Sequence, residues 1–236
     1  MSKISLSLLG IALLTLLIAG FSAAMVSAFP DDAIREKTFV TVYGDPVGEP
    51  YTNSYDVYAY SGIHWSGAQA NVVYYVNVKG APAGALAEVK AAFETWDAKI
   101  GDTLFSDNVG TVDRLAGNKY DSKNVVSWGR LGRGIIAQTT VWYNRYNYQI
   151  LEFGMVFSTA YKWGIDADGE GSTYRLTNAF DVQNIATHEA GHTLMLDDLY
   201  MKEANQLTMY GYGSYGETYA ISLGTGDISG IEAIYP

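Results

Sequence analysis

The chain has 236 residues, of which 48% are apolar and 17% charged, a balance typical of a folded globular protein and not of a disordered one. Its 15 basic and 25 acidic side chains give a net charge of −10, which argues against nucleic acid and anionic lipid as partners. The sequence contains no cysteine, which excludes disulfides, thiolate zinc sites, catalytic cysteines and lipid-anchoring cysteines.

The N-terminal segment has the pattern of an export signal. Lys3 precedes an apolar run from Ile4 to about Phe21, and small residues follow up to Ala28. We expect cleavage after Ala28, which makes residues 1–28 a signal peptide and the protein secreted. The apolar stretch counted whole is also long enough to cross a bilayer, so the alternative is a retained membrane anchor with the globular part outside the cytoplasm.

The segment that follows, residues 29–67, is polar, rich in tyrosine and interrupted by proline, and it shows no sustained period. Three interpretations fit this composition: a pro-segment, an N-terminal extension of a sheet, or a linker. The main domain is therefore expected over residues 68–236.

Beyond residue 70 the pattern predicts a mixture of strands and helices. Asn71–Lys79 is rich in valine and tyrosine, which predicts a strand. Gly84–Ile100 carries apolar residues at three- and four-residue spacing, which predicts an amphipathic helix that ends at Gly101. Glycine and asparagine separate four further β-like runs: Thr103–Ser106, Asn124–Trp128, Ile135–Tyr143 and Ile150–Ser158.

The next predicted helix carries the chemistry. Asp181 can cap it, and its apolar face leads into the sequence HEAGH at residues 188–192. Residues four apart lie on one face of a helix, so His188 and His192 can direct their imidazoles at one ion, with Glu189 beside it. A catalytic Zn²⁺ keeps one position open for water, whose proton a neighbouring carboxylate accepts. The chain has three histidines, and the remaining one, His64, is expected to have a surface or packing role.

A catalytic zinc needs a third protein ligand, and two spacing rules compete for it. In the first, the chain turns sharply after the helix and supplies a ligand six residues past the second histidine, which is Asp198, with Asp197 as the next candidate. In the second, a glutamate comes from a later helix, and Glu203 and Glu217 are the candidates. No convincing helical pattern surrounds either glutamate, so the sequence favours Asp198.

These residues resemble the metzincin zinc peptidases. The stretch from His188 to Asp198 is similar to the metzincin pattern HExxHxxGxxH/D, with aspartate in the last position as in the snapalysin family. The segment Leu207–Gly211 resembles the methionine-containing turn of the matrixins, and Gly226–Tyr235 resembles their C-terminal helix. The likeness spans about Asn71 to Pro236 and includes three earlier segments: Ala92–Trp96, Gly134–Ala137 and Met155–Phe157.

The resemblance implies a zincin-like α+β catalytic domain, with a five-stranded, twisted, mixed and mostly parallel sheet, an N-terminal helix, an active-site helix and a C-terminal helix. It implies that Met209 packs beneath the metal without binding it. It further implies a zinc endopeptidase whose polypeptide substrate adds as a strand to the sheet edge at Ile135, Ile136 and Ala137. Two alternatives remain: a Glu-liganded zinc peptidase, and a non-catalytic surface module that keeps zinc for structure.

Two departures from the family pattern carry expectations of their own. Met195 stands where the family has glycine, and its side chain is strained if φ there is positive. The structural-zinc histidines of the family are absent, so no second zinc is expected. Separately, Asp166, Asp168 and Glu170 alternate in a glycine-rich loop, which fits either a Ca²⁺ site or a solvated turn.

Overall fold

The computed structural model describes residues 32–44, 56–67, 70–101, 103–117, 119–171 and 176–236. The signal peptide or anchor predicted at residues 1–28 lies outside these ranges. Within them, no helix combines the length and apolar character that crossing a bilayer requires.

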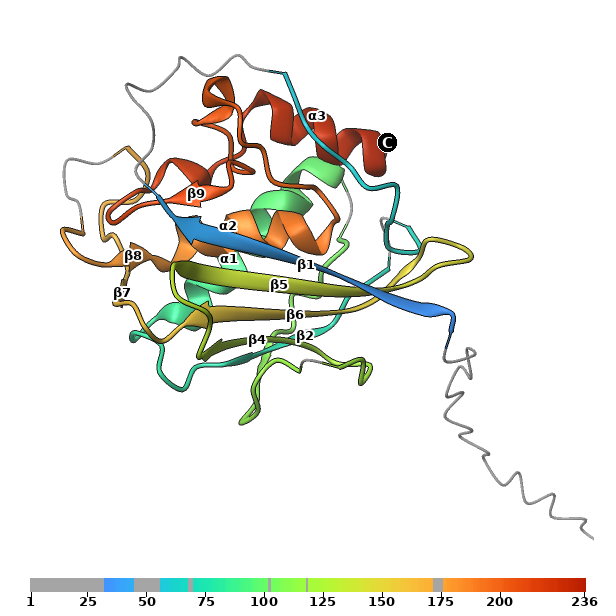
Figure 1. The fold of residues 1–236 in the computed structure, drawn as a ribbon, viewed down its shortest axis with the longest axis horizontal. Helices are drawn as coiled ribbons and strands as arrows, with labels where there is room; N and C mark the ends of the chain where they lie inside the picture. Colours follow the sequence, from blue (N-terminus) through green and yellow to red (C-terminus); the bar gives the residue numbers. More distant parts are fainter. Residues whose placement is uncertain (1–31, 45–55, 68–69, 102, 118, 172–175) are drawn as a thin grey trace, which may run out of the picture.

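The described residues form three α-helices and two sheets (Figure 1). The helices are α1 (Ala85–Ile100), α2 (Val182–Thr193) and α3 (Thr225–Ile234), and two 3-10 turns are η1 (Lys202–Ala204) and η2 (Tyr219–Ile221). The strands of the main sheet are β1 (Ile34–Tyr43), β2 (Tyr74–Asn77), β3 (Gly110–Thr111), β4 (Asn124–Gly129), β5 (Ile135–Asn144), β6 (Ile150–Ser158) and β9 (Tyr212–Gly213). A small second sheet pairs β7 (Trp163–Gly164) with β8 (Phe180–Asp181).

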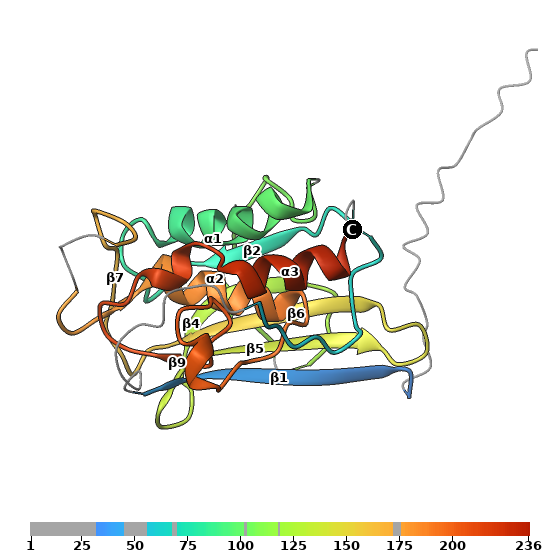
Figure 2. The ribbon, with the colours of Figure 1, turned by 90° about the horizontal axis from the view of Figure 1, so that it is seen from above.

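The main sheet is mixed and has the strand order β3-β2-β4-β6-β5-β1-β9. Pairing is parallel from β3 through β6, whereas β5 runs antiparallel to both β6 and β1. The helices lie together on one side of β1, β5 and β6 (Figure 2). The predicted α+β class with a mixed, largely parallel sheet is thus confirmed, but the sheet has seven strands and not five, because β1 and β9 extend it beyond β5.

Helix α1 forms where the apolar spacing predicts it, and it is hydrogen-bonded to α2. Val89, Phe93 and Trp96 are fully buried on one face, and glycines in the left-handed conformation flank the helix at both ends. The indole of Trp96 donates a 2.8 Å hydrogen bond to the carbonyl oxygen of Thr187 in α2. This bond ties α1 to the helix that carries the histidine motif.

Most predicted strands agree with the structure in position. The run Ile150–Ser158 is β6 without a change of bounds, and β4 and β5 are each one residue longer than predicted. The first strand is shorter at both ends, since β2 covers only Tyr74–Asn77, and Asn71 has a φ of 48°, outside the extended region. The predicted run Thr103–Ser106 contributes an isolated bridge between Phe105 and Val72.

The described residues ahead of position 68, which are 32–44 and 56–67, pack with the rest of the described chain. Strand β1 lies within the main sheet, and Phe39, Ile63 and Trp65 are buried in the common core with residues of α1 and α2. The indole of Trp65 donates a 3.0 Å hydrogen bond to the carbonyl oxygen of Thr193 at the end of α2. Within the described ranges β1 extends the main sheet, which is one of the three interpretations given for residues 29–67.

Candidate metal centre

Helix α2 is capped by Asp181, the residue that the sequence predicts as its N-cap. The side chain of Asp181, the last residue of β8, accepts a 2.8 Å hydrogen bond from the backbone N–H of Asn184. Its other oxygen accepts the N–H of Asp166, also at 2.8 Å. Capping fixes where the helix starts, and this determines which of its residues face the sheet.

Two histidines of α2 and one aspartate of the following loop converge on one point. Nε2 of His188 lies 3.0 Å from Nε2 of His192, and Oδ1 of Asp198 lies 3.3 and 3.4 Å from these two nitrogens. Four-coordinate zinc with ligands at about 2.0–2.1 Å places them about 3.3 Å apart. Among the residues that the structure describes, this is the one group of three metal-ligating side chains whose ligand atoms all lie within 4.8 Å of one another.

The far nitrogen of each imidazole determines what faces the cluster. Nδ1 of His188 lies 2.7 Å from the carbonyl oxygen of Thr208, and Nδ1 of His192 lies 2.8 Å from that of Leu196. A carbonyl oxygen only accepts, so both Nδ1 atoms carry protons and both Nε2 atoms of the neutral rings present lone pairs. Buried Oδ1 of Asp198 has no hydrogen-bond donor. Three electron-pair donors without a shared proton fit a bound cation.

Asp198 and His188 shift each other's pKa values. Burial acts to lower the pKa of His188, but the neighbouring Asp198 carboxylate outweighs this effect and leaves the pKa raised. Burial acts to raise the pKa of the Asp198 carboxyl, but His192 and His188 together hold it far below its usual range. The carboxylate is therefore ionised and stabilises positive charge at this position.

The other candidate ligands lie elsewhere. Asp197 points away from the histidines and forms an ion pair with Lys37, while its second oxygen accepts a 3.0 Å hydrogen bond from Ser61. Glu217 accepts the backbone N–H of Ser214 at 2.7 Å, and Glu203 is exposed in η1. The structure thus brings Asp198 to the histidines and none of the three alternatives.

The turn between α2 and Asp198 passes through a left-handed residue. Met195 has a φ of 65° and is fully buried. Its N–H donates to the carbonyl of His192 at 2.9 Å, and the N–H of Leu196 donates to the carbonyl of Gly191 at 3.2 Å. This is the paired bonding of a Schellman cap, in which glycine is the usual left-handed residue. The strain expected at Met195 is therefore present, and the chain turns despite it.

The segment Leu207–Gly211 lies beneath the cluster. Met209 is buried, and its sulfur lies against Gly191 so closely that a Cβ at that glycine would collide with it. Met209 is not part of the ligand cluster. The carboxylate of Asp227 in α3 accepts the N–H groups of Thr208 and Met209 at 2.8 and 3.1 Å. Helix α3 thus holds the segment whose carbonyl orients His188.

Glu189 lies one residue from the first ligand and is fully buried. Its two carboxylate oxygens accept hydrogen bonds from threonine hydroxyls, Thr41 of β1 at 2.6 Å and Thr139 of β5 at 2.5 Å. Neither threonine was predicted from the sequence. The available signal was the two-residue period of a strand, which places every second side chain on one side of the sheet, Thr41 with Phe39 and Thr139 with Ala137.

The predicted sheet edge is not free. Ile135, Ile136 and Ala137 begin β5 as expected, but β1 pairs with this strand along its length, with Thr41 opposite Ala137. The prediction that these three residues form the edge of the sheet is wrong for this structure. The reason is that the run TFVTV within β1 is rich in β-branched and aromatic residues and has strong strand propensity, so β1 pairs with the open edge of β5 from within the same chain.

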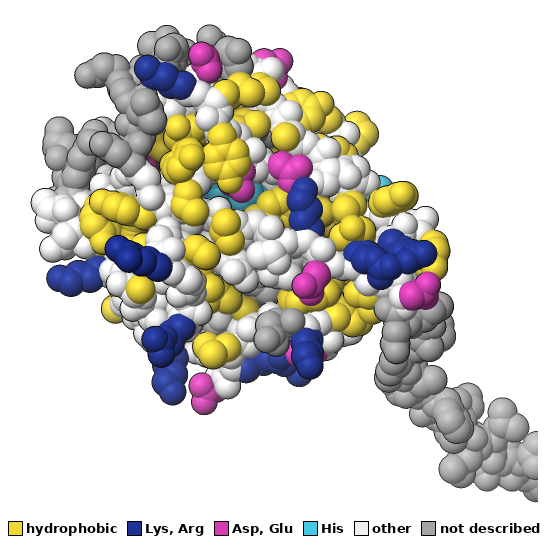
Figure 3. All heavy atoms as spheres, in the orientation of Figure 1, with side chains coloured by type: hydrophobic (Ala, Val, Ile, Leu, Met, Phe, Trp, Pro, Cys, Tyr) yellow, Lys and Arg dark blue, Asp and Glu magenta, His cyan; other side chains and the backbone are white. Residues whose placement is uncertain are grey.

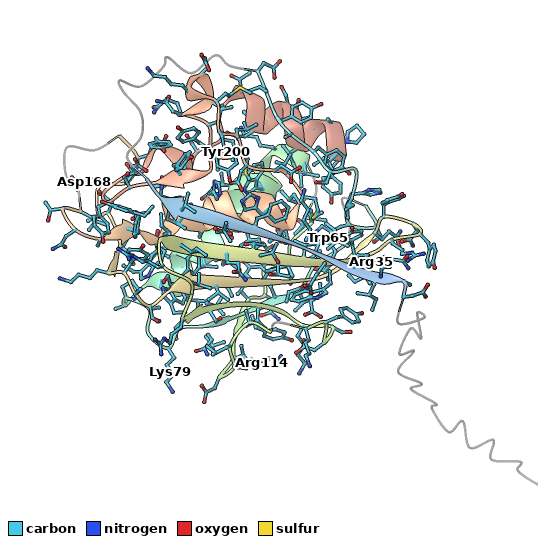
Figure 4. All side chains as sticks on the ribbon, viewed as in Figure 1. Arg35, Trp65, Lys79, Arg114, Asp168 and Tyr200 are labelled. Carbon is cyan, nitrogen blue, oxygen red and sulfur yellow. The ribbon has the colours of Figure 1, made fainter. Side chains whose placement is uncertain are left out.

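A tyrosine stands next to the third ligand. The hydroxyl of Tyr200 is hydrogen-bonded to the Asp198 carboxylate, and burial together with that negative charge raises the pKa of Tyr200 to about 12. Tyr200 projects toward the end of β1 that lies nearest β9 (Figure 4). In the space-filling view, histidine atoms are visible in a depression on this face, between apolar and acidic side chains (Figure 3).

The glycine-rich loop does not assemble a carboxylate cluster. Glu170 accepts a 2.9 Å hydrogen bond from the hydroxyl of Ser222, and Asp166 accepts the backbone N–H of Asp168 at 3.1 Å. These side chains are not among the metal-ligating groups found in the described part of the chain. The described residues therefore lend no support to a Ca²⁺ site here. His64 likewise lies outside the cluster, with Nδ1 3.4 Å from the hydroxyl of Tyr60.

Comparison with known proteins gives no family assignment, since no protein-family model matches the chain and no curated protein matches it significantly.

Proposed function

We propose that this protein is a zinc-dependent endopeptidase with a zincin-type, metzincin-like fold. The observation that carries the proposal is the convergence of two imidazole Nε2 lone pairs and one orphaned carboxylate oxygen, with Glu189 on the same helix. A set of two imidazole nitrogens and one carboxylate oxygen suits Zn²⁺, and three protein ligands leave a coordination position for water. A structural zinc site has no need of a carboxylate base beside it.

Each residue of the site has a distinct role in the proposed reaction. His188, His192 and Asp198 would hold the ion, which when bound supplies Lewis acidity toward a peptide carbonyl and acidifies water. Glu189 accepts the proton of the attacking water and transfers it to the leaving amine. Thr208 and Leu196 orient the ligating rings through their carbonyl oxygens.

Several features of the fold support the assignment to the metzincin-like class. A mixed sheet carries the motif helix on one side, a tight left-handed turn follows at Met195, and Met209 packs beneath the ligands. The sequence resemblance runs in the same chain order. Export through residues 1–28 belongs to the proposal, with secretion as the expected outcome and a retained anchor as the alternative.

The decisive experiment combines zinc analysis with a cleavage assay. Purified protein is incubated with denatured casein with and without a zinc chelator, and Glu189→Gln is treated in parallel. We expect about one zinc per chain, cleavage that stops on chelation, and a loss of about 100-fold or more in E189Q without loss of zinc. Unchanged cleavage in E189Q would overturn the mechanism.

One observation favours a second candidate, a non-catalytic zinc module. Glu189 is fully buried and both of its oxygens are already hydrogen-bonded, to Thr41 and Thr139. Stoichiometric zinc without cleavage by any variant described below would favour this candidate. The Glu-liganded alternative receives no such support, since Glu203 and Glu217 lie outside the cluster.

A further inference from the structure

Strand β1 touches the candidate centre through three alternate side chains. Lys37, Phe39 and Thr41 point to the same side of the sheet, as residues two apart in a strand do. We propose, resting on the peptidase function above, that β1 is an autoinhibitory strand. It fills the position in which a polypeptide substrate would pair with β5, and it must leave before such a substrate can reach the metal centre.

The first contact is a hydrogen bond from Thr41 to the proposed base, Glu189. The hydroxyl of Thr41 donates to Oε1 of Glu189 at 2.6 Å, while Thr139 donates to Oε2 at 2.5 Å. The Glu189 side chain has no solvent exposure. Since the base has to accept a proton from water, a hydroxyl that donates to it competes with that water directly. Thr139 belongs to β5, so Thr41 is the partner that leaves when β1 leaves.

The second contact covers a ligand. The ring of Phe39 stacks on the imidazole of His192, with ring centroids 4.2 Å apart and planes 7° from parallel. Phe39 is itself buried, and the ammonium group of Lys37 lies 4.8 Å from the centroid of the same phenyl ring. An apolar ring in this position excludes water from that face of the imidazole.

The third contact fixes the strand to the ligand loop. Lys37 forms an ion pair with Asp197, the residue next to the third ligand, and donates a 2.5 Å hydrogen bond to the hydroxyl of Ser61. The three side chains of β1 therefore contact Glu189, His192 and Asp197. Each of these belongs to the motif helix or to the loop that follows it.

The backbone of β1 uses the groups that a substrate strand would need. It pairs antiparallel with β5 from Ile34 to Val42, and parallel with β9 at Val42 and Tyr43. Figure 1 shows β1 between these two strands, in front of α2. Strand addition requires unpaired N–H and C=O groups on the receiving strand. With β1 in place, β5 has none to offer along the paired stretch.

The packing of β1 is consistent with release. Of its ten residues only Phe39 and Thr41 are buried, whereas most residues of β5 and β6 are. A strand with few buried side chains, paired with β9 at only two positions, opens at a lower free energy than the centre of the sheet. The position of β1 therefore depends on a few contacts at the metal centre.

A reversible covalent lock tests the proposal on the full chain. Thr38 and Thr140 lie opposite each other in β1 and β5, with hydroxyl oxygens 3.0 Å apart, and the sequence has no cysteine to interfere. The double variant T38C/T140C is loaded with zinc and assayed on denatured casein, oxidised and then reduced with a phosphine. The matched control is Q138C/V156C, which joins β5 to β6 and leaves β1 free.

We expect the oxidised T38C/T140C protein to cleave at least about tenfold more slowly than the same sample after reduction, with zinc content unchanged. Oxidation should leave the Q138C/V156C control within about twofold of its reduced rate. Equal rates for locked and reduced T38C/T140C would overturn the autoinhibitory role and leave the peptidase function standing. Zinc binding without cleavage in every form would overturn both, because nothing would then be inhibited.

A second pair of variants tests the contact with the base. Thr41→Val keeps the shape and strand propensity of the residue but removes the hydroxyl that Glu189 accepts. We expect kcat/KM for casein to rise about tenfold or more, because a hydrogen bond to a charged group holds β1 in place. Thr38→Val, on the opposite face of the same strand, should remain within about threefold of wild type. A rate for T41V at or below that of T38V would overturn the proposal.

Discussion

Nδ1 of His188 lies 2.7 Å from the backbone carbonyl of Thr208, which joins the first ligand to a segment 20 residues further along the chain. Asp227 of α3 in turn accepts the N–H of Thr208 and the N–H of Met209. The geometry of the metal centre therefore depends on a helix that contributes no ligand. Outer partners of this kind fix the tautomer and direction of a ligating ring.

The first prediction concerns Asp227. Asp227→Asn replaces an acceptor of three backbone N–H groups, those of Thr208, Met209 and Gly224, with an amide that can accept through one oxygen only. We expect zinc affinity to fall about 10-fold, in the range known for outer partners of ligands. Competition with a chromophoric chelator measures this, and Glu232→Gln, an exposed carboxylate of the same helix, is the control. An unchanged affinity would show that α3 supports the fold but not the site.

The second prediction separates two adjacent aspartates. Asp198→Ala removes the third ligand and should lower zinc affinity by more than the roughly 10–100-fold that loss of an outer partner costs. Asp197→Ala removes the ion pair with Lys37 and should leave zinc affinity within about threefold. Both values come from the same chelator titration. If Asp197→Ala proved the more damaging of the two, the ligand assignment would have to be exchanged.

This pair of aspartates also shows where sequence reasoning ends. The spacing of six residues past His192 predicted Asp198 as the ligand. Asp197 has the same chemistry, and the two side chains differ only in the direction in which they point. Asp197 is drawn away by Lys37, which lies 160 residues earlier in the chain. Helices α1 and α2 were predictable because their caps and apolar spacing are local signals.

Strand β1 was not predictable in the same way. The run TFVTV favours a strand, but nothing local indicates that it pairs with a strand about a hundred residues away. The two threonines on Glu189 became visible only through that pairing. Met195 was the opposite case, since a side chain in a glycine position is a conflict that the sequence itself displays.

The third prediction concerns pH. Glu152 of β6 is 1% exposed, and burial raises its pKa from 4.5 to about 7, although the N–H groups of Asp121 and Lys123 donate to it. The folded state thus binds this proton more tightly than the unfolded state does. Its contribution to stability is fully present below about pH 4.5 and is lost as the pH rises toward 7.

Glu152→Gln removes this titration. We expect the free energy of unfolding of the wild type, relative to that of E152Q, to fall on the order of 2 kcal/mol between pH 4.5 and 7.5. Urea denaturation in the presence of chelator measures it without a contribution from zinc. Glu203→Gln, at an exposed position, is the control variant. A flat difference for E152Q would mean that the carboxylate is well solvated in the folded protein.

The last prediction tests the strain at Met195. Both Met195→Ala and Met195→Gly empty a fully buried position, and each should lower the free energy of unfolding by about 2–5 kcal/mol. They differ in the backbone, because alanine keeps a Cβ in the left-handed conformation at φ 65° and glycine does not. We therefore expect M195G to be more stable than M195A by about 1 kcal/mol. At Leu194, where φ is −98°, the order should reverse, with alanine the more stable by about 0.5–1 kcal/mol. Urea denaturation of the four variants gives both differences, and the same order at the two positions would contradict a strained turn ahead of the third ligand.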